Sequence, residues 1–411
     1  MSRKLPRVPL ARHGRLRSPG AFAQIATFLV AVVAVVVVGV GGTAVFAAWS
    51  ATDLVQEKAI TLESSTPLPP SIGEIEGGVN LLLVGTDSCE GQDVKIFPRC
   101  AHDDGGERND VTMLIHIGDN PRRVTVVSFP RDMIVPIPSC PSADGGRYSA
   151  MSAQMLNSSY EYGGLACTAL TIENLTGVDI QFAAAIRWTG VINMSDAIGG
   201  VDVCVAGDIN DSNTGLHLKA GEHTLKGTKA LQFLRIRHGI GDGSDLGRIS
   251  NQQQFMSSLV RKLQSGGVLA DPTKLFALAT TALQQVSNGQ LVLDENLANP
   301  TRMVQIAMAV KSVPYKDIVF IQYPTVYDPA DESRVLPVTS AADTLFAALK
   351  ANKSLSLTGK ASPVDGVDVT GTAEGSPDPS ASPTTDPDAV ELPSSITGST
   401  AAEVTCTQPQ H

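Results

Sequence analysis

The feature that most constrains this 411-residue chain is an apolar stretch at residues 21–49, rich in valine, alanine and glycine. No charged residue lies between Arg17 and Asp53. As a helix this stretch would rise about 43 Å, against about 30 Å of hydrocarbon in a bilayer. The sequence therefore predicts one transmembrane helix. A cleavable signal peptide is the alternative, because Ala47 and Ala48 are small, but its apolar region would span only about 7–15 residues.

The charge distribution orients this helix. Residues 1–20 carry six basic side chains and no acidic one. Because basic flanks stay on the cytoplasmic side, we expect a cytoplasmic N-terminus and an extracytoplasmic domain, in a single-pass protein of the cell membrane. The whole chain has 31 basic against 41 acidic residues, so the part after the apolar stretch is more acidic still. Such a body would repel a nucleic-acid backbone, and no nucleic acid is expected as a partner.

All six cysteines follow the apolar stretch, on the side where disulfides form. Cys89 and Cys100 are close in sequence and flank a stretch rich in glycine and aspartate, so a disulfide between them is the favoured pairing. The sequence does not choose among pairings of the other four. A zinc site of Cys89, Cys100 and His102 is the alternative, but no CxxC or HxxxH spacing supports it.

Composition divides the outer chain into three parts. Residues 50–78, with several prolines and glycines, are predicted to form a stalk, and residues 79–358 a single domain. Residues 359–411 are dominated by Pro, Ser, Thr, Gly and Asp, which predicts a disordered tail. Within that tail, Cys406 alone indicates an attachment point, because a cysteine can form a disulfide.

Strand-like and helix-like patterns alternate within residues 79–358. The expected strands are 79–84, 111–117, 124–129, 181–186, 201–205, 291–293 and 317–322. The expected helices are 151–162, 166–175, 190–198, 228–234, 246–263, 272–286, 300–311 and 340–350. This alternation predicts an α/β fold in which helices cover a layered mixed β-sheet.

Charged residues stand where three of the expected strands begin or end. Asp87 ends the first strand, Arg108 and Asp110 precede the second, and Arg131 follows the third. In open α/β sheets, ligands bind in the crevice at the strand ends. Aspartate also terminates strands as an ordinary turn residue, so each residue taken alone is a weak signal.

A more specific signal follows at residues 231–248. Arg235 and Arg237 would diverge on a helix but align on an extended segment, so both can serve one ligand only if the helix ends near Leu234. A glycine-rich turn follows, and Ser244 or Asp245 can cap the next helix.

On that next helix, Asp245, Arg248 and Gln252 fall at i, i+3 and i+7, which keeps them on one face. A helix N-terminus beside several guanidinium groups suits an anion, and phosphate fits best. The alternative is a capped amphipathic helix with a surface ion pair between Asp245 and Arg248.

Two carboxylates, Asp87 and Asp110, together with five arginines suit a polyanion that is bridged by a divalent cation. Mg²⁺ takes oxygen ligands, usually one or two carboxylates and substrate phosphates, although another divalent cation could serve. The sequence has no Walker A motif, GxSxG elbow or HExxH pair. It therefore lacks the signatures of P-loop nucleotide binding, serine hydrolysis and zinc proteolysis.

At these positions the sequence resembles the LytR-CpsA-Psr family of membrane-anchored cell-envelope phosphotransferases. The resemblance covers roughly residues 79–265, and a single-pass anchor with an outer catalytic domain is the family's arrangement too. The matching blocks are NLLLVGTD at 80–87, RNDVT at 108–112, VSFPRD at 127–132, LTGV at 175–178, IGGVD at 198–202, ALQFLRIR at 230–237 and DLGRISNQQ at 245–253.

The resemblance implies that residues 79–358 transfer a glycopolymer from a polyprenyl-pyrophosphate carrier to a muramic acid hydroxyl of peptidoglycan, releasing polyprenyl phosphate. By motif position, Asp87 and Asp110 would bind Mg²⁺ or help to activate the acceptor. Asp245 and Gln252 would orient the arginines, and the lipid would lie in an apolar groove between sheet and helices. The arginines that would hold the pyrophosphate are Arg108, Arg131, Arg235, Arg237 and Arg248.

Two other functions remain open at this point. A pyrophosphatase would hydrolyse the same carrier linkage with water in place of the sugar hydroxyl. A non-catalytic binding module for anionic wall polymers would use the arginines alone, but acids among the arginines weaken anion binding unless a cation intervenes. The identity of the glycopolymer is not encoded in any motif of the sequence.

Overall fold

The computed structural model describes residues 55–63, 68–69, 71–72, 75, 78–102, 106–142, 144–265, 268–269, 271–360, 366–373 and 389–410. The basic segment 1–20 and the expected transmembrane helix 21–49 lie outside these residues, as does part of the expected stalk. Among the helices that are described, none has both the length and the apolar character needed to cross a bilayer.

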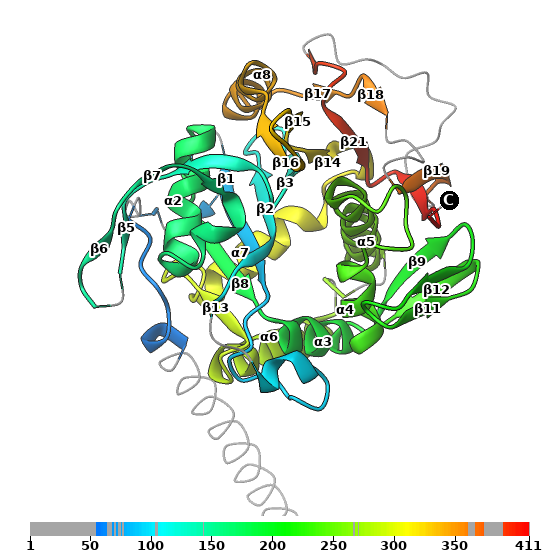
Figure 1. Cartoon of the computed structure of the whole chain (residues 1–411), viewed down its shortest axis with the longest axis horizontal. Helices are drawn as coiled ribbons and strands as arrows, with labels where there is room; N and C mark the ends of the chain where they lie inside the picture. Colours follow the sequence, from blue (N-terminus) through cyan, green and yellow to red (C-terminus); the bar gives the residue numbers. More distant parts are fainter. Residues whose placement is uncertain are drawn as a thin grey trace, which may run out of the picture. The chain divides into compact units, whose positions relative to one another are not determined.

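An eight-stranded mixed sheet forms the centre of the described part, with the strand order β13-β8-β1-β2-β3-β14-β21-β18 (Figure 1). The β1/β8, β3/β14 and β18/β21 pairs are parallel and the others antiparallel. The expected mixed sheet is therefore confirmed. The strand bounds are β1 Val79–Thr86, β2 Asn109–Ile117, β3 Val124–Phe129, β8 Phe182–Ile186, β13 Leu291–Leu293, β14 Ile318–Gln322, β18 Gly359–Lys360 and β21 Thr397–Thr400.

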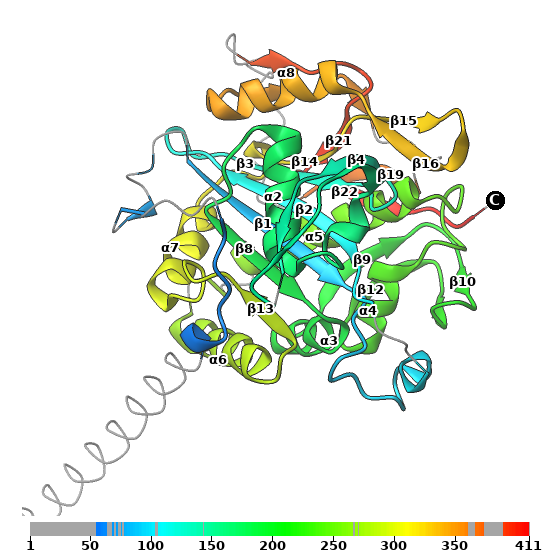
Figure 2. The ribbon, with the colours of Figure 1, turned by 60° about the vertical axis from the view of Figure 1, so that its left-hand side comes forward.

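Alternation along the strands divides their apolar side chains between two cores. Leu82 and Val127 point into the first core, whereas Met113 and Phe320 point into the second. The helices that cover the sheet are α2 (Gly164–Thr176), α8 (Thr339–Lys350), α6 (Pro272–Ser287) and α7 (Pro300–Lys311). Side chains of α2 and α8 complete the first core, and those of α6 and α7 the second, so helices pack on both faces (Figure 2).

A smaller sheet with the order β12-β9-β22-β19 stands beside the central one. Its strands are β9 (Val201–Val205), β12 (Gly221–Leu225), β19 (Val367–Thr372) and β22 (Glu403–Thr407), and the nearby helices are α3 (Trp188–Ala197), α4 (Thr228–Arg235) and α5 (Asp245–Ser265). Helix α5 links the two sheets, because Gln253 Nε2 donates to Ser128 Oγ of β3 (3.3 Å) and Gln254 Nε2 to the Cys204 carbonyl of β9 (2.8 Å). Its buried glutamines are thereby satisfied.

The remaining elements are short. They comprise the paired strands β4 (Ile134–Ile137) and β7 (Met151–Met155), β5 (Cys140–Pro141) and β6 (Arg147–Tyr148), β10 (Ile209–Asp211) and β11 (Leu216–Leu218), β15 (Thr325–Asp328) and β16 (Asp331–Pro337), β17 (Leu355–Ser356) and β20 (Val390–Glu391), and the 3₁₀ helices η2 (Pro98–Ala101), η3 (Leu156–Ser159) and η4 (Tyr315–Asp317). The helix expected at 151–162 is wrong. Pairing of Met155 with Ile134 and of Met151 with Ile137 makes its first half a strand.

The expectation of a disordered tail at 359–411 is wrong for the tail residues that are described. Strand β21 pairs with β14 in the central sheet, and β22 pairs with β9 and β19. A disulfide between Cys204 and Cys406 closes a separation of 202 residues. Closing a loop of that size destabilises the unfolded chain by about 5 kcal/mol, because it removes chain entropy. This contribution helps to order a polar segment that has few large apolar side chains.

Two further disulfides join Cys89 to Cys100 and Cys140 to Cys167. The pairing favoured from the sequence is therefore confirmed. With both thiols oxidised, Cys89 and Cys100 offer no thiolate to a metal, so the zinc alternative is wrong.

Candidate functional site

The sheet brings three of the predicted site positions to one edge. Strand β1 runs antiparallel to β2, with Thr86 opposite Asn109, and β2 runs antiparallel to β3, with Thr112 opposite Phe129. The residue after β1, the start of β2 and the residues after β3 therefore lie together. These positions hold Asp87, Asp110 and Arg131.

The α4–α5 segment folds as its sequence predicts. Helix α4 ends at Arg235, and Ile236 is extended (φ −58°, ψ 134°), so the chain leaves the helix before Arg237. The Ser244 hydroxyl accepts a hydrogen bond from the Gly247 amide (3.1 Å), which caps α5 just before Asp245.

Ion pairs join the sheet edge to the start of α5. Arg131 Nη1 lies 2.6 Å from Asp110 Oδ1, and Arg131 Nε lies 3.4 Å from Asp132 Oδ2 and 3.6 Å from Asp245 Oδ1. Arg248 Nη2 lies 2.5 Å from Asp245 Oδ1 and donates to the Asp110 carbonyl (3.0 Å). We call these five residues the central cluster. Asp245 and Arg248 are buried, whereas Arg131 and Asp110 are partly open to solvent.

Burial and charge act against each other in this cluster. Burial by itself lowers the pKa of Arg131, but the carboxylates of Asp110, Asp132 and Asp245 outweigh it and raise the pKa above its ordinary range. Burial raises the pKa of Asp132; Arg131 opposes this shift and Asp245 adds to it. Neither Asp245 oxygen makes a hydrogen bond of good geometry, although both are buried. Arg131 thus stays charged, and the three carboxylates around it neutralise its charge from within the site.

A second group of residues surrounds Trp188, the first residue of α3. The guanidinium carbons of Arg99 and Arg235 lie 4.4 and 4.3 Å from the Trp188 ring centroid, which is cation–π distance. Arg99 Nη2 also donates to the Asp87 carbonyl (2.6 Å) and lies 3.3 Å from Asp87 Oδ2. Burial lowers the pKa of Arg235, while Asp110 and Asp87 oppose the shift, so Arg235 lies within electrostatic range of both acids. Trp188 therefore connects the Asp87 side to the central cluster.

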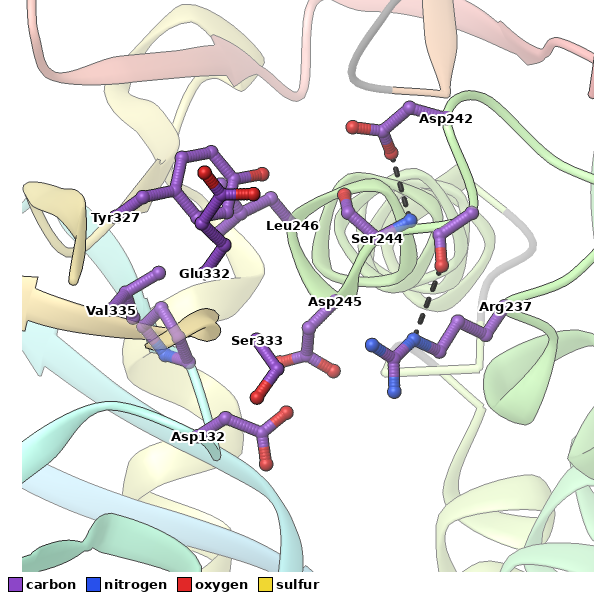
Figure 3. A pocket seen from close by; sticks show the side chains of 12 residues that line it. Asp132, Arg237, Asp242, Ser244, Asp245, Leu246, Tyr327, Glu332, Ser333 and Val335 are labelled. Atoms are coloured by element: carbon purple, nitrogen blue, oxygen red, sulfur yellow. Dashed lines mark hydrogen bonds between the residues drawn. The ribbon is translucent and has the colours of Figure 1, made fainter. Parts of the chain in front are cut away.

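Arg237 lines a pocket at the start of α5, together with Ser244, Asp245 and Leu246. Its Nε donates to the Gly243 carbonyl (3.1 Å), and its charge opposes the raised pKa of Asp132. Figure 3 shows Arg237, Asp132 and Asp245 pointing into one space, with Glu332 and Ser333 of β16 across from them. The pocket has a volume of about 230 Å³, and acids outnumber bases in its lining.

Like Asp87, Arg235 and Arg237, the predicted residues Arg108 and Gln252 lie outside the ion pairs of the central cluster. The Arg108 side chain, about half exposed, pairs with Glu161 (3.4 Å), and only its backbone amide contacts Asp87 Oδ1 (2.9 Å). Gln252 Nε2 donates to the Leu234 carbonyl (2.9 Å), at the end of α4. Gln252 thus holds the helix end that carries Arg235.

Sequence reasoning missed Arg99, Trp188 and Asp132 as members of the site. Arg99 precedes Cys100 in the loop closed by the predicted disulfide, which is a signal that it is held near Asp87. Asp132 adjoins Arg131 in the VSFPRD block. For Trp188 the sequence offers only the rarity of tryptophan, which occurs twice in the chain.

The acids at the sheet edge are potential ligands of a divalent cation. Asp87 and Asp110 offer only oxygen, and Arg235 senses both of their charges. Oxygen donors are the ligands that Mg²⁺ takes. In the structure the two carboxylates are paired with Arg99 and Arg131, and Mg²⁺ stays a prediction from the sequence.

Comparison with known proteins adds the family. A model described as the LytR_cpsA_psr family matches residues 45–351, more than half of the chain. The chain belongs to the LytR-CpsA-Psr family. That match includes the sheet edge, α4 and α5, but it ends before β19 to β22.

Two curated family relatives are similar over part of their length. The "Cell wall biosynthesis protein LcpA" of Corynebacterium glutamicum is 29% identical over 241 residues, covering 54% of this chain and 45% of the relative. The "Polyisoprenyl-teichoic acid--peptidoglycan teichoic acid transferase TagU" of Bacillus anthracis is 29% identical over 184 residues, covering 45% and 52%. The chain spans about half the length of the curated relatives it matches.

A solved structure supports the fold of this LytR-CpsA-Psr domain. The "LytR-Csp2A-Psr enzyme from Actinomyces oris" superposes with a TM-score of 0.50 at 21% identity, covering 71% of this chain and 95% of that one. At this identity the likeness concerns the arrangement of the sheet and helices. It agrees with the mixed α/β fold expected from the sequence.

Proposed function

We propose that this LytR-CpsA-Psr domain transfers a glycopolymer phosphate from a polyprenyl-pyrophosphate carrier to a muramic acid hydroxyl of peptidoglycan. The observation that carries the proposal is the meeting of Arg131, from the sheet edge, with Arg248 and Arg235, from the α4–α5 segment, around Asp110. A guanidinium group can bind two phosphate oxygens at once through two parallel N–H donors. The charge of a pyrophosphate therefore calls for several arginines. The printed name of TagU, which specifies a polyisoprenyl-linked donor and a peptidoglycan acceptor, supports the same reaction class.

In the proposed reaction, the acceptor hydroxyl attacks the phosphorus that bears the glycopolymer. A new O–P bond forms, the bond to the bridging oxygen breaks, and polyprenyl phosphate leaves with the electron pair of that bond. The hydroxyl proton passes to a carboxylate at the sheet edge. Arg131, Arg235 and Arg248 hold the charge that develops, since phosphoryl transfer demands positioning and neutralisation rather than a covalent intermediate.

Asp87 and Asp110 are the residues that would hold Mg²⁺, which would neutralise charge on the pyrophosphate when bound. Gln252 keeps Arg235 in place through the end of α4, and Asp245 orients Arg248. The acid-lined pocket beside Arg237 suits an uncharged, hydroxyl-rich acceptor better than a second anion. We place the acceptor sugar there, and the lipid of the donor in an apolar groove between sheet and helices.

The membrane placement is part of the proposal. Residues 1–20 would lie in the cytoplasm and residues 21–49 would span the membrane, leaving the LytR-CpsA-Psr domain outside, where both the lipid-linked donor and peptidoglycan are present. Membership of a family with cell-wall biosynthesis proteins supports this placement.

The test uses the full chain in detergent with a polyprenyl-pyrophosphate-linked oligosaccharide, Mg²⁺ and peptidoglycan fragments. Arg237→Ala and Asp110→Ala are expected to abolish formation of the phosphodiester while the protein stays folded. Arg334→Ala is the control, because Arg334 is an exposed arginine of β16 whose partner is Asp331. Wild-type rates in either site variant would overturn the assignment of these residues.

The same assay separates the two alternatives. A pyrophosphatase would release the oligosaccharide phosphate free in solution whether or not peptidoglycan is present. A binding module would form no product, and its affinity for an anionic wall polymer would be unchanged by EDTA. The proposed transferase requires the acceptor and loses activity in EDTA.

A further inference from the structure

The C-terminal strap, defined as residues 403–410, lies outside the family match and yet contacts the segment that carries the site arginines. Its first part is β22, which pairs in parallel with β9 at Cys406 and Thr407. The disulfide from Cys406 to Cys204 fixes the strand covalently at this point. The strap is therefore anchored before it reaches the site.

Beyond β22, the strap pairs with the glycine-rich loop at 238–243, which connects Arg237 to α5. The Gln410 amide donates to the Gly239 carbonyl (2.9 Å), and Gln410 Oε1 accepts from the Gly239 amide (2.9 Å). The Gly241 amide donates to the Gln408 carbonyl (3.2 Å). Gly239, Gly241 and Gly243 all have positive φ, so the loop has little conformational preference of its own. Its shape is set by these contacts.

A second line of contacts runs from the strap through α5 to the end of α4. Thr407 Oγ1 lies 2.6 Å from Asn251 Oδ1 and also contacts Gln254 Oε1, and both Thr407 and Asn251 are fully buried. Asn251 Nδ2 donates to the Phe233 carbonyl (2.7 Å), two residues before Arg235. One short chain of hydrogen bonds thus links the disulfide-anchored strand to the helix end that presents Arg235.

We infer that the C-terminal strap positions Arg235 and Arg237, and that its residues Thr407 and Gln410 are positioning residues of the active site. The inference rests on the proposed function, because Arg235 would hold the donor pyrophosphate and Arg237 lines the pocket assigned to the acceptor sugar. Thr407 and Gln410 are not among the residues assigned to bind the donor or the acceptor. The strap acts by restricting the backbone on which both guanidinium groups are carried.

The variants that test this are Thr407→Val, which keeps the side-chain shape and removes the hydroxyl, and Thr407→Ser, which restores the hydroxyl. Cys204→Ser combined with Cys406→Ser releases the anchor, and Cys140→Ser combined with Cys167→Ser is the matched control, since that disulfide packs in a separate small cluster. Thermal unfolding confirms that each full-length variant is folded. Thr407→Val is the mild variant if the disulfide variant fails to fold.

Three quantities are measured: hydrogen exchange of the Gly239 and Gly241 amides, affinity for inorganic pyrophosphate, and rate of transfer. We expect Thr407→Val and the Cys204/Cys406 variant to speed exchange at least tenfold, to weaken pyrophosphate binding about fivefold and to slow transfer about tenfold, with recovery in Thr407→Ser. The control disulfide variant should match the wild type in all three.

Unchanged exchange in the Cys204/Cys406 variant would overturn the inference, as would faster exchange with wild-type pyrophosphate affinity. Failure of the proposed function has a different signature. In that case the wild type forms no phosphodiester, while amide exchange and pyrophosphate affinity still respond to the strap variants.

Discussion

Replacing Trp188 offers the sharpest test of how the arginines are held. The Trp188 ring has Arg235 at 4.3 Å and Arg99 at 4.4 Å, and it packs on Phe97 with 4.8 Å between ring centroids. A cation–π contact contributes about 2 kcal/mol when the cation is desolvated and about 0.5–1 kcal/mol when it is exposed. Arg235 is partly buried and burial lowers its pKa, whereas the Arg99 side chain is 53% exposed, so most of the effect concerns Arg235.

Trp188→Leu keeps apolar contact with Phe97 but removes the ring face. Loss of a cation–π contact worth about 2 kcal/mol, which orients Arg235, corresponds to about a 30-fold loss in kcat/KM for transfer. Trp188→Phe retains a weaker ring and should lose only about fivefold. Because a smaller side chain also leaves a cavity, Phe320→Leu in the second core of the sheet is the control for stability alone.

The assay is transfer from a polyprenyl-pyrophosphate-linked oligosaccharide to peptidoglycan fragments by the full chain, with urea unfolding of each variant alongside. We expect the transfer rate to decrease in the order wild type, Trp188→Phe, Trp188→Leu. Phe320→Leu should be less stable than the wild type but equally active per folded molecule. Equal losses in the Phe and Leu variants would refute the cation–π argument. A Leu variant within twofold of the wild type would do so as well.

We make three other predictions, two for residues of the site and one for a buried histidine of β2. Arg131→Lys should lower transfer about 100-fold, because an ammonium group lacks the planar fork that places Nη1 on Asp110 and Nε on Asp132 and Asp245, and the lost pairing is worth about 3 kcal/mol. Circular dichroism should show an unchanged fold. Cys89→Ser combined with Cys100→Ser should release Arg99 from the Trp188 ring. The lost cation–π contact is worth less than about 1 kcal/mol, so the affinity for pyrophosphate, measured by calorimetry, should weaken about threefold. Burial lowers the pKa of His116 to about 4 from 6.5, so the unfolded chain takes up this proton first as pH falls. The free energy of unfolding should therefore fall by about 3 kcal/mol between pH 6.5 and pH 4. Urea unfolding at a series of pH values measures this fall, and an equally steep fall in His116→Gln would contradict the prediction.

The parts of the fold that the sequence predicts well are those with a local signal. The strands ending near Asp87 and Arg131 are apolar runs with punctuation, and the break between Arg235 and Asp245 is marked by glycines and a capping serine. Their convergence at one edge follows from antiparallel pairing of successive strands. Local pattern and topology together therefore predict most of the central cluster.

The parts that sequence reasoning missed depend on contacts between distant residues. The composition of the tail predicts disorder because the tail has few large apolar side chains. Composition carries no information on long-range contacts, here the pairing of β22 with β9 and the disulfide to Cys204. Trp188 becomes informative only when two arginines, one from the Cys89–Cys100 loop and one from α4, are placed on its ring. The helix expected at 151–162 failed for a related reason, since apolar spacing at Met151 and Met155 also fits a strand paired with β4.

The ion pairs also bear on the order of events at the site. Arg131 and Arg248, brought together without compensation, would repel each other, and here each carboxylate of the central cluster lies against one of their guanidinium groups. Under the proposed function, an anionic donor would compete with Asp110 for Arg131 Nη1, which lies 2.6 Å from Asp110 Oδ1. Displacement of Asp110 would free its oxygens for a cation or a proton. Donor binding would then release a carboxylate, so an acid that neutralises the arginines would become available for chemistry once the pyrophosphate is in place. Under the proposed function, Asp110→Asn should therefore bind inorganic pyrophosphate more tightly than the wild type in EDTA and still fail to transfer, and weaker binding by this variant in EDTA would contradict the exchange.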